Sequence, residues 1–170
     1  MALTEDLNAL AQALRAKGWR LATAESCTGG LIAAACTSLA GSSDWFDRGF
    51  VTYSNEAKVQ MLGVDASLIA QHGAVSREVA CAMAVGALRH SLAEVAVAVT
   101  GIAGPGGAVP GKPAGTVWLA IAVQAQAPQP WLLHFPGDRT AVREATVAEA
   151  IRRLIPCTGG AAGAPALELT

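Results

Sequence analysis

The sequence has little charge and no closely paired cysteines. Charged residues make up 15% of the 170 residues, and the formal net charge is −1. Because nucleic-acid binding relies on clustered Lys and Arg, this balance predicts no DNA or RNA partner. The four cysteines, Cys27, Cys36, Cys81 and Cys157, lie far apart and form no C-x-x-C pair. Their spacing argues against a zinc or redox site and indicates reduced thiols.

Long hydrophobic runs and a targeting segment are also missing. No apolar stretch approaches the roughly 18 residues that a membrane span needs, so no membrane partner is expected. The N-terminal stretch MALTEDLNALAQALRAKG combines early acidic residues with leucines at helical spacing, which is unlike a signal peptide. We therefore expect a cytoplasmic protein. Hydrophobic residues reach 52%, which is enough for the core of one domain.

Helical and strand patterns alternate along most of the chain. Helices are predicted over residues 4–17, 55–63, 65–73, 76–90 and 138–156, and one more helix is predicted to end at Gly41. The predicted N-terminal caps are Asn55, Asp65, Ser76 and Asp138, and Pro156 is expected to end the last helix. Strands are predicted over residues 19–25, 45–54, 94–101, 116–124 and 130–137. This alternation predicts an α/β fold, a three-layer α/β/α sandwich with a mostly parallel sheet, to which the last two strands can add antiparallel pairing. We expect one domain over residues 1–156 and a disordered tail over 157–170.

The stretch ATAESCTGGLIAA, residues 22–34, joins a predicted strand to a predicted helix. Ser26 or Thr28 can cap that helix. Ser26 can instead be a nucleophile, with N–H groups of the helix start stabilising a developing negative charge. The neighbouring Gly29 and Gly30 favour the nucleophile, because glycine lets backbone N–H groups approach a bound group closely. Cys27 is a rival nucleophile, but its side chain is expected to point elsewhere.

A serine nucleophile needs a base to activate it. The histidines His72, His90 and His134 have no obvious acidic partner in the sequence, so a Ser-His-Asp triad is not expected. The motif TYSNEAK brings Tyr53 close to Lys58 in a chain that has only three lysines and one tyrosine. Lys58 is therefore either a solvated helix residue or the base.

Two further motifs stand at element boundaries. The segment TGIAGPGG, residues 100–107, follows a buried strand, at the sheet edge where parallel α/β proteins bind ligands. It is either a ligand-binding loop or a flexible connection. Arg139 opens the last helix within PGDRTAVR, where a cation opposes the helix dipole. A bound anion would relieve that conflict, and the alternative is an exposed arginine in a surface ion pair.

Several long motifs occur in one order over residues 5–155: TAESCTGG, AGSSDWFDRGFVTYSNEAKVQMLGV, HGAVS, AVTGIAGPGG, KPAGTVWLAI and FPGDRTAVR. Together they resemble the CinA C-terminal domain family, specifically its stand-alone nicotinamide-nucleotide amidohydrolases. The resemblance implies hydrolysis of nicotinamide mononucleotide, a small-molecule substrate, to nicotinate mononucleotide and ammonia in pyridine nucleotide (NAD) salvage. It also implies a mixed sheet, a homo-oligomer with a dimer favoured, no metal and no cofactor.

The resemblance also suggests roles for individual residues. It implies that Ser26 is the nucleophile, that Lys58 and Tyr53 are catalytic partners, and that Thr100 and Arg139 belong to the site. On this basis the expected catalytic residues are Ser26, Lys58 and Tyr53. The expected substrate-binding residues are Thr28, Gly29, Gly30, Thr100, Gly101, Gly104, Gly106 and Arg139.

The predicted mechanism begins with a neutral Lys58, because burial lowers the pKa of a lysine, and this amine takes the proton of Ser26. Ser26 attacks the carboxamide carbon, N–H groups of the following turn stabilise the oxyanion, and Tyr53 helps to pass a proton to the leaving ammonia. Water then cleaves the acyl-enzyme, while the 100–107 loop and Arg139 hold the ribose phosphate. The alternative is a catalytically silent nucleotide-binding domain with a regulatory role.

Overall fold

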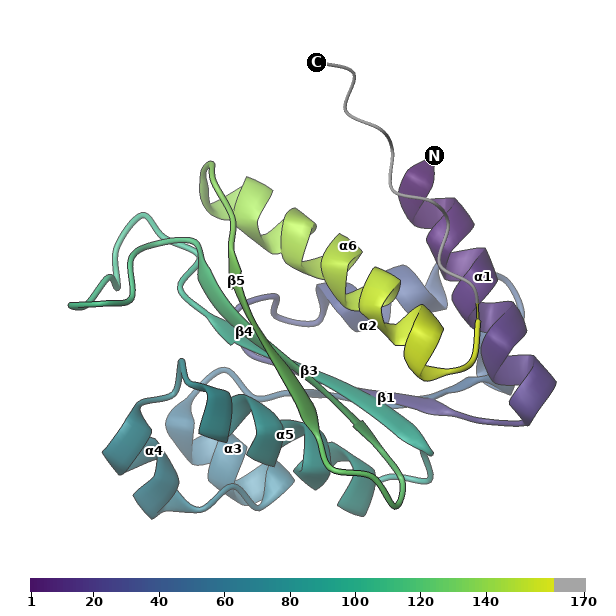
Figure 1. Ribbon diagram of the computed structural model, residues 1–170, viewed down its shortest axis with the longest axis horizontal. Coiled ribbons are helices and arrows are strands. Elements are labelled where there is room, and N and C mark those ends of the chain that lie inside the picture. The colour runs from purple at the N-terminus through teal and green to yellow at the C-terminus, as the bar shows by residue number, and fades with distance from the viewer. Residues whose placement is uncertain (161–170) are drawn as a thin grey trace.

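A five-stranded sheet lies between two layers of helices in the computed structural model, which describes residues 1–160 (Figure 1). The elements along the chain are α1 (Ala2–Lys17), β1 (Leu21–Glu25), α2 (Leu31–Thr37), the 3₁₀ turn η1 (Ser42–Asp44), β2 (Phe46–Val51), α3 (Asn55–Leu62), α4 (Ala66–His72), α5 (Arg77–Arg89), β3 (Val95–Gly101), β4 (Thr116–Val123), β5 (Gln129–His134) and α6 (Arg139–Cys157). The helices α1, α2 and α6 cover one face of the sheet, and α3, α4 and α5 cover the other.

The sheet is mixed, with the strand order β2-β1-β3-β4-β5. β1 pairs in parallel with β2 and β3, whereas β4 pairs antiparallel with β3 and β5. The predicted three-layer fold with a mixed sheet is therefore confirmed, and the last two strands do add antiparallel pairing. Glu25 at the end of β1 lies opposite Val99 of β3. The segments that follow these two strands therefore begin side by side, at the edge where ligands bind in α/β sheets.

β3 divides its side chains between two hydrophobic cores. Its sequence alternates Val and Ala, and successive side chains of a strand point to opposite faces of the sheet. Val95, Val97 and Val99 join the core under α1, α2 and α6. Ala96 and Ala98 join the core under α3, α4 and α5. This alternation explains why a strand with hardly any polar residue is buried along both faces in a three-layer protein.

Three of the five predicted helix caps are confirmed. The confirmed caps are Asp65, Ser76 and Asp138, each of which accepts a backbone N–H of its first turn. The prediction that Asn55 caps α3 is wrong, because Ser54 Oγ accepts the N–H of Ala57 at 3.0 Å. The cap precedes the predicted one by a single residue, which makes Asn55 the first residue of the helix.

α2 ends earlier than predicted, at Thr37 rather than close to Gly41. The Thr37 hydroxyl donates to the carbonyl of Ala33 at 2.8 Å, and the Ser38 hydroxyl donates to that of Ala35 at 2.6 Å. Hydroxyl groups that bond to nearby carbonyls compete with the helical backbone and favour its end.

α6 continues through Pro156 to Cys157, so the prediction that Pro156 ends the helix is wrong. A proline so near the end of a helix removes only one hydrogen bond and leaves the preceding turns intact. The helix stops just beyond, where Gly159 has a left-handed φ of 80°. Residues 161–170, most of the predicted tail, lie outside the described residues.

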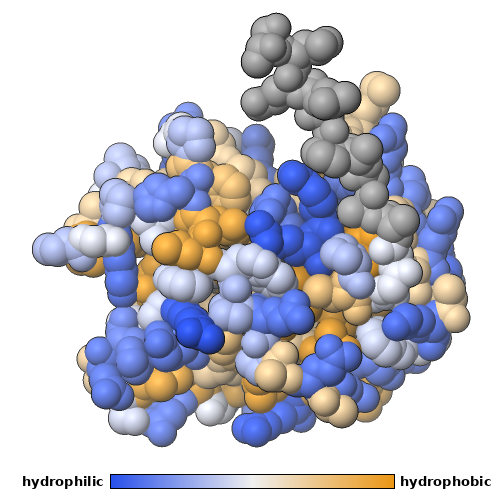
Figure 2. Space-filling view, viewed as in Figure 1, coloured by the Kyte–Doolittle hydropathy of each residue, from blue (hydrophilic) through white to orange (hydrophobic). Residues whose placement is uncertain are grey.

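The outer surface mixes residue types. The face drawn in Figure 2 carries hydrophobic patches that are separated by hydrophilic side chains. No helix among residues 1–160 is long and apolar enough to cross a bilayer.

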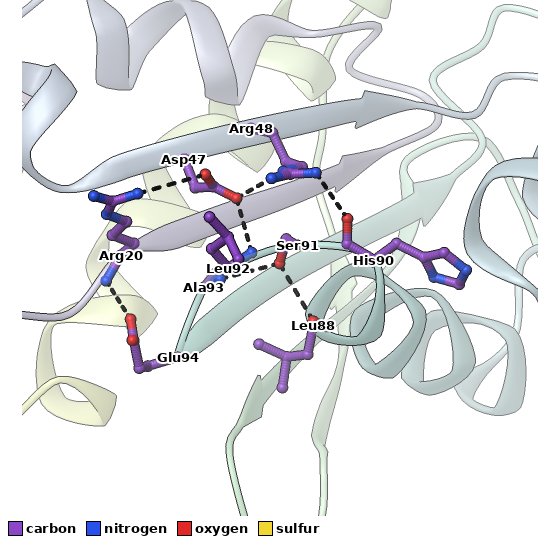
Figure 3. Close-up of polar contacts among 9 residues, drawn as sticks. All are labelled: Arg20, Asp47, Arg48, Leu88, His90, Ser91, Leu92, Ala93 and Glu94. Atoms are coloured by element: carbon purple, nitrogen blue, oxygen red, sulfur yellow. Dashed lines mark hydrogen bonds and ion pairs between the residues drawn. The ribbon is translucent and has the colours of Figure 1, made fainter.

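A polar cluster joins the start of β2 to the loop between α5 and β3 (Figure 3). The Asp47 carboxylate accepts Arg48 Nε at 2.7 Å and the N–H of Leu92 at 3.0 Å, and an Arg20 nitrogen lies 4.0 Å away. Burial alone would raise the pKa of Asp47, but these hydrogen bonds and positive charges together lower it. The cluster lies at the amino ends of the strands, away from the edge where ligands bind.

Asp47→Asn should lower the free energy of unfolding by about 1–2 kcal/mol, because it weakens hydrogen bonds to a charged group. Since the pKa of Asp47 is lower in the folded protein, its stabilisation is present above the unfolded carboxyl pKa and is lost as pH falls through the folded pKa. Urea unfolding at neutral pH and at about pH 3 should therefore show a gap between wild type and variant that shrinks in acid.

The matched control is Asp44→Asn, whose side chain is 67% exposed and lies 3.5 Å from Arg15. Exposed ion pairs contribute about 0–1 kcal/mol, so this variant should differ little from wild type. If the difference in unfolding free energy between wild type and Asp47→Asn is the same at both pH values, the carboxylate charge is not its cause.

Candidate active site

A cavity of about 220 Å³ opens at the carboxyl ends of β1 and β3. Its walls are formed by Ser26, Cys27, Tyr53, Asn55, Lys58, Ala74, Val75, Thr100, Gly101, Ala103 and Arg139. Six residues that the sequence singled out therefore meet in one place: Ser26, Tyr53, Lys58, Thr100, Gly101 and Arg139.

Lys58 lies against Ser26 at the bottom of this cavity. Its Nζ is 3.1 Å from Ser26 Oγ and also donates to the carbonyls of Thr52 at 2.8 Å and Tyr53 at 3.4 Å. The side chain is buried, with 1% of the residue exposed, so the alternative of a solvated helix lysine is wrong. Burial lowers the pKa of the Lys58 ammonium, which increases the neutral fraction near pH 7. No carboxylate in the described part of the chain pairs with it.

Glu25, which sequence reasoning missed, holds the turn that carries Ser26. Its buried carboxylate accepts the Thr28 hydroxyl at 2.6 Å and the N–H groups of Ile32 at 2.8 Å and Ala33 at 3.0 Å. The prediction that Ser26 or Thr28 caps α2 is therefore wrong, because a carboxylate from the preceding strand binds the free N–H groups of the first turn. Neither hydroxyl is used as a cap, and the Ser26 hydroxyl faces Lys58.

The two glycines shape the turn rather than the cavity wall. Gly29 and Gly30 have φ of 59° and 105°, a left-handed conformation that side chains disfavour. Gly29 N–H donates to the Ser26 carbonyl at 3.1 Å. The N–H groups of Cys27, Thr28 and Gly30 bond to no other residue of the described chain. The turn therefore has several backbone donors without a partner immediately after Ser26, although of these three residues only Cys27 lines the cavity and Thr28 is buried beneath the turn's surface.

Cys27 points into the hydrophobic core, as expected. It is 6% exposed, and burial raises the pKa of its thiol to about 11. The thiol is therefore protonated near neutral pH and is a poor nucleophile.

Arg139 closes one side of the cavity. Its Nη1 donates to the Gly104 carbonyl at 2.9 Å, and its Nη2 donates to the Tyr53 hydroxyl at 3.0 Å. Tyr53 is 61% exposed, so its ring stands at the mouth of the cavity while its carbonyl contacts Lys58 inside. Arg139 therefore bonds to a carbonyl and a hydroxyl. The alternative prediction, an exposed arginine in a surface ion pair, does not describe these contacts.

A second hollow of about 280 Å³ adjoins the first one at the start of α6. Its walls are formed by Ala103, Gly104, Pro105, Ala114, Gly137, Asp138, Arg139 and Thr140. Ala103 and Arg139 border both hollows. Arg139 therefore borders both the Ser26 cavity and the hollow at the N-terminal end of a 19-residue helix, an end that favours anions but where the Asp138 carboxylate already accepts the N–H of Ala141 at 2.9 Å.

The remaining residues expected to bind substrate lie at different places. Thr100 lines the cavity and donates its hydroxyl to the Ala74 carbonyl at 2.9 Å. Gly101 is required by packing, because a Cβ there would lie 2.7 Å from a methyl group of Val117. Gly104 belongs to the second hollow, whereas Gly106 is exposed and lines neither hollow.

The histidines stay outside the site. None of His72, His90 and His134 lines the cavity that contains Ser26. His72 does have an acidic neighbour that the sequence did not reveal, since its Nδ1 lies 3.7 Å from Glu78. The expected absence of a triad at Ser26 agrees with this arrangement.

Arg143 and Asn55 complete the surroundings, and sequence reasoning gave neither a role in the site. Arg143 Nε donates to the Cys27 carbonyl and its Nη2 to the Thr28 carbonyl, both at 3.1 Å. A usable signal was its position four residues after Arg139, which places both side chains on one face of α6. Asn55 lines the cavity beside Lys58 in the same motif.

Comparison with known proteins identifies close relatives. The CinA C-terminal domain model matches residues 4–158. Nicotinamide-nucleotide amidohydrolase PncC of Shigella flexneri is 54% identical over 143 residues, covering 84% of this chain and 87% of that protein. The Escherichia coli K12 protein of the same name is 53% identical over equal shares.

A solved structure shows the same fold. The competence/damage inducible protein CihA from Agrobacterium tumefaciens superposes with a TM-score of 0.89 at 46% sequence identity, covering 92% of this chain and 95% of that one. The family match and the identity to these relatives both extend over most of the chain. This chain therefore belongs to the CinA C-terminal domain family.

Proposed function

We propose that this protein is an amidase that hydrolyses the carboxamide of nicotinamide mononucleotide to nicotinate mononucleotide and ammonia, in pyridine nucleotide salvage. The observation that carries the proposal is the 3.1 Å contact between Ser26 Oγ and the buried Nζ of Lys58. The relatives named nicotinamide-nucleotide amidohydrolase, at 53% and 54% identity, support the enzyme class and the substrate.

The first step is proton transfer from Ser26 to Lys58. A neutral amine 3.1 Å from the hydroxyl can accept its proton, and burial lowers the pKa of Lys58 toward the range where that form is populated. The resulting alkoxide attacks the carboxamide carbon and forms a tetrahedral intermediate. Nearby carbonyls of Thr52 and Tyr53 hold the amine in line during the transfer.

The backbone of the turn stabilises the intermediate. We assign the oxyanion to the unpaired N–H groups among Cys27, Thr28 and Gly30, which follow the nucleophile directly. The N–H groups of the first turn of α2 cannot serve, because Glu25 already binds those of Ile32 and Ala33.

The Lys58 ammonium then gives its proton to the departing nitrogen, which leaves as ammonia. A water molecule attacks the resulting ester of Ser26 while Lys58 removes one of its protons. Lys58 returns this proton to Ser26 Oγ as the ester bond breaks, and the acid product is released. Tyr53 was expected to help with the leaving-group proton. We now assign its hydroxyl to substrate binding, because it lies 3.0 Å from Arg139 and not at Lys58.

The two adjoining hollows suggest how the nucleotide lies. We place the pyridine ring and its carboxamide in the cavity of Ser26 and the phosphate in the hollow at the start of α6. A helix N-terminus and a guanidinium together make a favourable phosphate site. Arg139 borders both hollows and so can contact the phosphate end of a ligand that spans them.

Ammonia release by the purified protein tests this function. Incubation with nicotinamide mononucleotide should yield equal amounts of ammonia and nicotinate mononucleotide. Binding of the nucleotide without either product would support the silent regulatory domain instead.

Size-exclusion chromatography with light scattering would test the further proposals of a single domain over residues 1–156 and a homo-oligomer, and cell fractionation would test a cytoplasmic location.

Arg139→Gln should chiefly weaken binding of phosphorylated substrate. Loss of one charge-assisted hydrogen bond costs on the order of 1.5–3 kcal/mol, which is about 10- to 150-fold in KM. The measurement compares nicotinamide mononucleotide with its dephosphorylated riboside. Wild type should prefer the mononucleotide, and the variant should narrow that preference.

The matched control for this experiment is Arg152→Gln, on the same helix but in a surface ion pair with Glu149 at 3.3 Å. It should retain the wild-type preference. Equal losses on both substrates in Arg139→Gln would remove this arginine from the phosphate site.

A further inference from the structure

Arg143 contacts the turn that carries Ser26, although it does not line the cavity and has no part in the mechanism above. Its guanidinium reaches from α6 and donates to the carbonyls of Cys27 and Thr28, both at 3.1 Å. It makes no ion pair with a carboxylate of residues 1–160. A partly buried cation that bonds only to two consecutive backbone carbonyls fixes the backbone there.

Peptide geometry links these bonds to the donors of the turn. In a trans peptide the C=O and N–H groups point in opposite directions. Fixing the Cys27 carbonyl therefore aims the Thr28 N–H away from Arg143, and that N–H has no partner within the described chain. Fixing the Thr28 carbonyl likewise aims the Gly29 N–H, which donates to the Ser26 carbonyl at 3.1 Å. A carbonyl that binds a cation is also polarised, which strengthens the N–H of its own peptide as a donor.

The opposite side of the turn is held by Glu25. Its carboxylate bonds to the Thr28 hydroxyl and to two N–H groups of α2. These bonds fix the side chain of Thr28 and the start of the helix but leave the carbonyls of Cys27 and Thr28 to Arg143. The nucleophile turn is thus held between a carboxylate from β1 and a guanidinium from α6.

We propose that Arg143 is a positioning residue for the amidase reaction: it orients the peptides after Ser26 so that the hydroxyl meets Lys58 and the unpaired N–H groups of the turn face the oxyanion. It acts through the turn and does not touch the substrate. This inference rests on the proposed function of the Ser26 cavity.

Arg143→Ala should lower kcat by about 100-fold, the effect of a small misplacement of reacting groups, with KM nearly unchanged. Arg143→Lys should recover only part of this loss, because an ammonium lacks the planar fork that binds two acceptors at once. Millimolar guanidinium should restore kcat of Arg143→Ala several-fold, and sodium chloride at equal ionic strength should not. The control is Arg152→Ala, because Arg152 forms a surface ion pair on α6. Its kcat should equal that of wild type and should not change when guanidinium is added.

A second readout does not depend on the substrate. Labelling of Ser26 by a fluorophosphonate, followed by mass spectrometry, reports the reactivity of the nucleophile alone. Arg143→Ala should label more slowly than wild type, with guanidinium restoring the rate, even if the nucleotide turns out not to be the substrate. If no ammonia is released but Arg143→Ala still labels more slowly than wild type and guanidinium restores the rate, only the proposed function would be contradicted.

Three results would overturn the positioning role. Wild-type kcat and labelling in Arg143→Ala would show that the turn does not need the guanidinium. A raised KM with unchanged kcat would make Arg143 a substrate ligand. A loss of activity that parallels a loss of the folded state by circular dichroism, without rescue by guanidinium, would make it structural only.

Discussion

Ser26→Ala should release ammonia at least about 1,000-fold more slowly than wild type while it remains folded and binds the nucleotide. The substitution removes the oxygen that lies 3.1 Å from Lys58 and leaves the turn intact, because Glu25 and Arg143 hold it through other atoms. Loss of the hydrogen bond should cost only about 1 kcal/mol of stability. Steady-state kinetics, thermal unfolding and calorimetric binding of the nucleotide measure the three quantities.

Cys27→Ala is the matched control for this result. The thiol packs in the core and is protonated near neutral pH, with a pKa raised to about 11 by burial. Alanine avoids burying a serine hydroxyl among apolar side chains, so the variant should keep most of its activity. An inactive Cys27→Ala enzyme that folds normally, beside an active Ser26→Ala enzyme, would transfer the nucleophile to the thiol.

Lys58→Met should also lose at least about 1,000-fold in kcat, because methionine keeps much of the side-chain volume but cannot accept a proton. Binding of the nucleotide should change little, since Lys58 contacts Ser26 and two backbone carbonyls at the bottom of the cavity. A variant with weaker binding and normal kcat would make Lys58 a substrate ligand, and the base would then have to lie elsewhere.

The pH dependence of both activity and stability follows from the same group. Burial lowers the pKa of Lys58 below its ordinary value of 10.5, and the neutral amine is the active form. Wild-type kcat should therefore rise with pH through that lowered pKa. Between the folded and unfolded pKa values the unfolded state holds the extra proton, so wild-type stability should also rise with pH in this window. Lys58→Met should lack this rise, and its stability relative to wild type should fall as pH increases.

The sequence predicted the fold well because local patterns determine most of its elements. The alternation of Val95, Ala96 and Val97 in β3 reports burial on two faces, and each confirmed cap lies beside the helix that it starts. Three errors moved a cap or a helix end by only a few residues, at Asn55, Gly41 and Pro156. The fourth arose because a partner from elsewhere replaced a local one. At α2 the cap is Glu25 from the strand before the turn, and no rule for helix starts points to a residue five positions before the N-cap at Gly30.

The site was predictable only in part for the same reason. Ser26 and Lys58 are 32 residues apart, and their contact was suggested by family resemblance and not by spacing. Arg143 lies 116 residues from Cys27, and its spacing from Arg139 places it on the site's face of α6 but does not predict which carbonyls it binds. Tyr53 was grouped with Lys58 because they share a motif, whereas its hydroxyl reaches Arg139 on another element. Contacts of this kind depend on how the layers pack, which a local pattern does not contain.

Partitioning with hydroxylamine tests most directly whether catalysis passes through an acyl-enzyme on Ser26. Hydroxylamine competes with water for an acyl-enzyme, so the ratio of hydroxamate to acid depends only on the intermediate and not on the group that left. The measurement compares the carboxamide nucleotide with the methyl ester of nicotinate mononucleotide at one hydroxylamine concentration. Attack by Ser26 predicts the same ratio from both substrates and no hydroxamate above background with Ser26→Ala, whereas ratios that differ between the two substrates would contradict a shared intermediate and place the attack on a directly activated water.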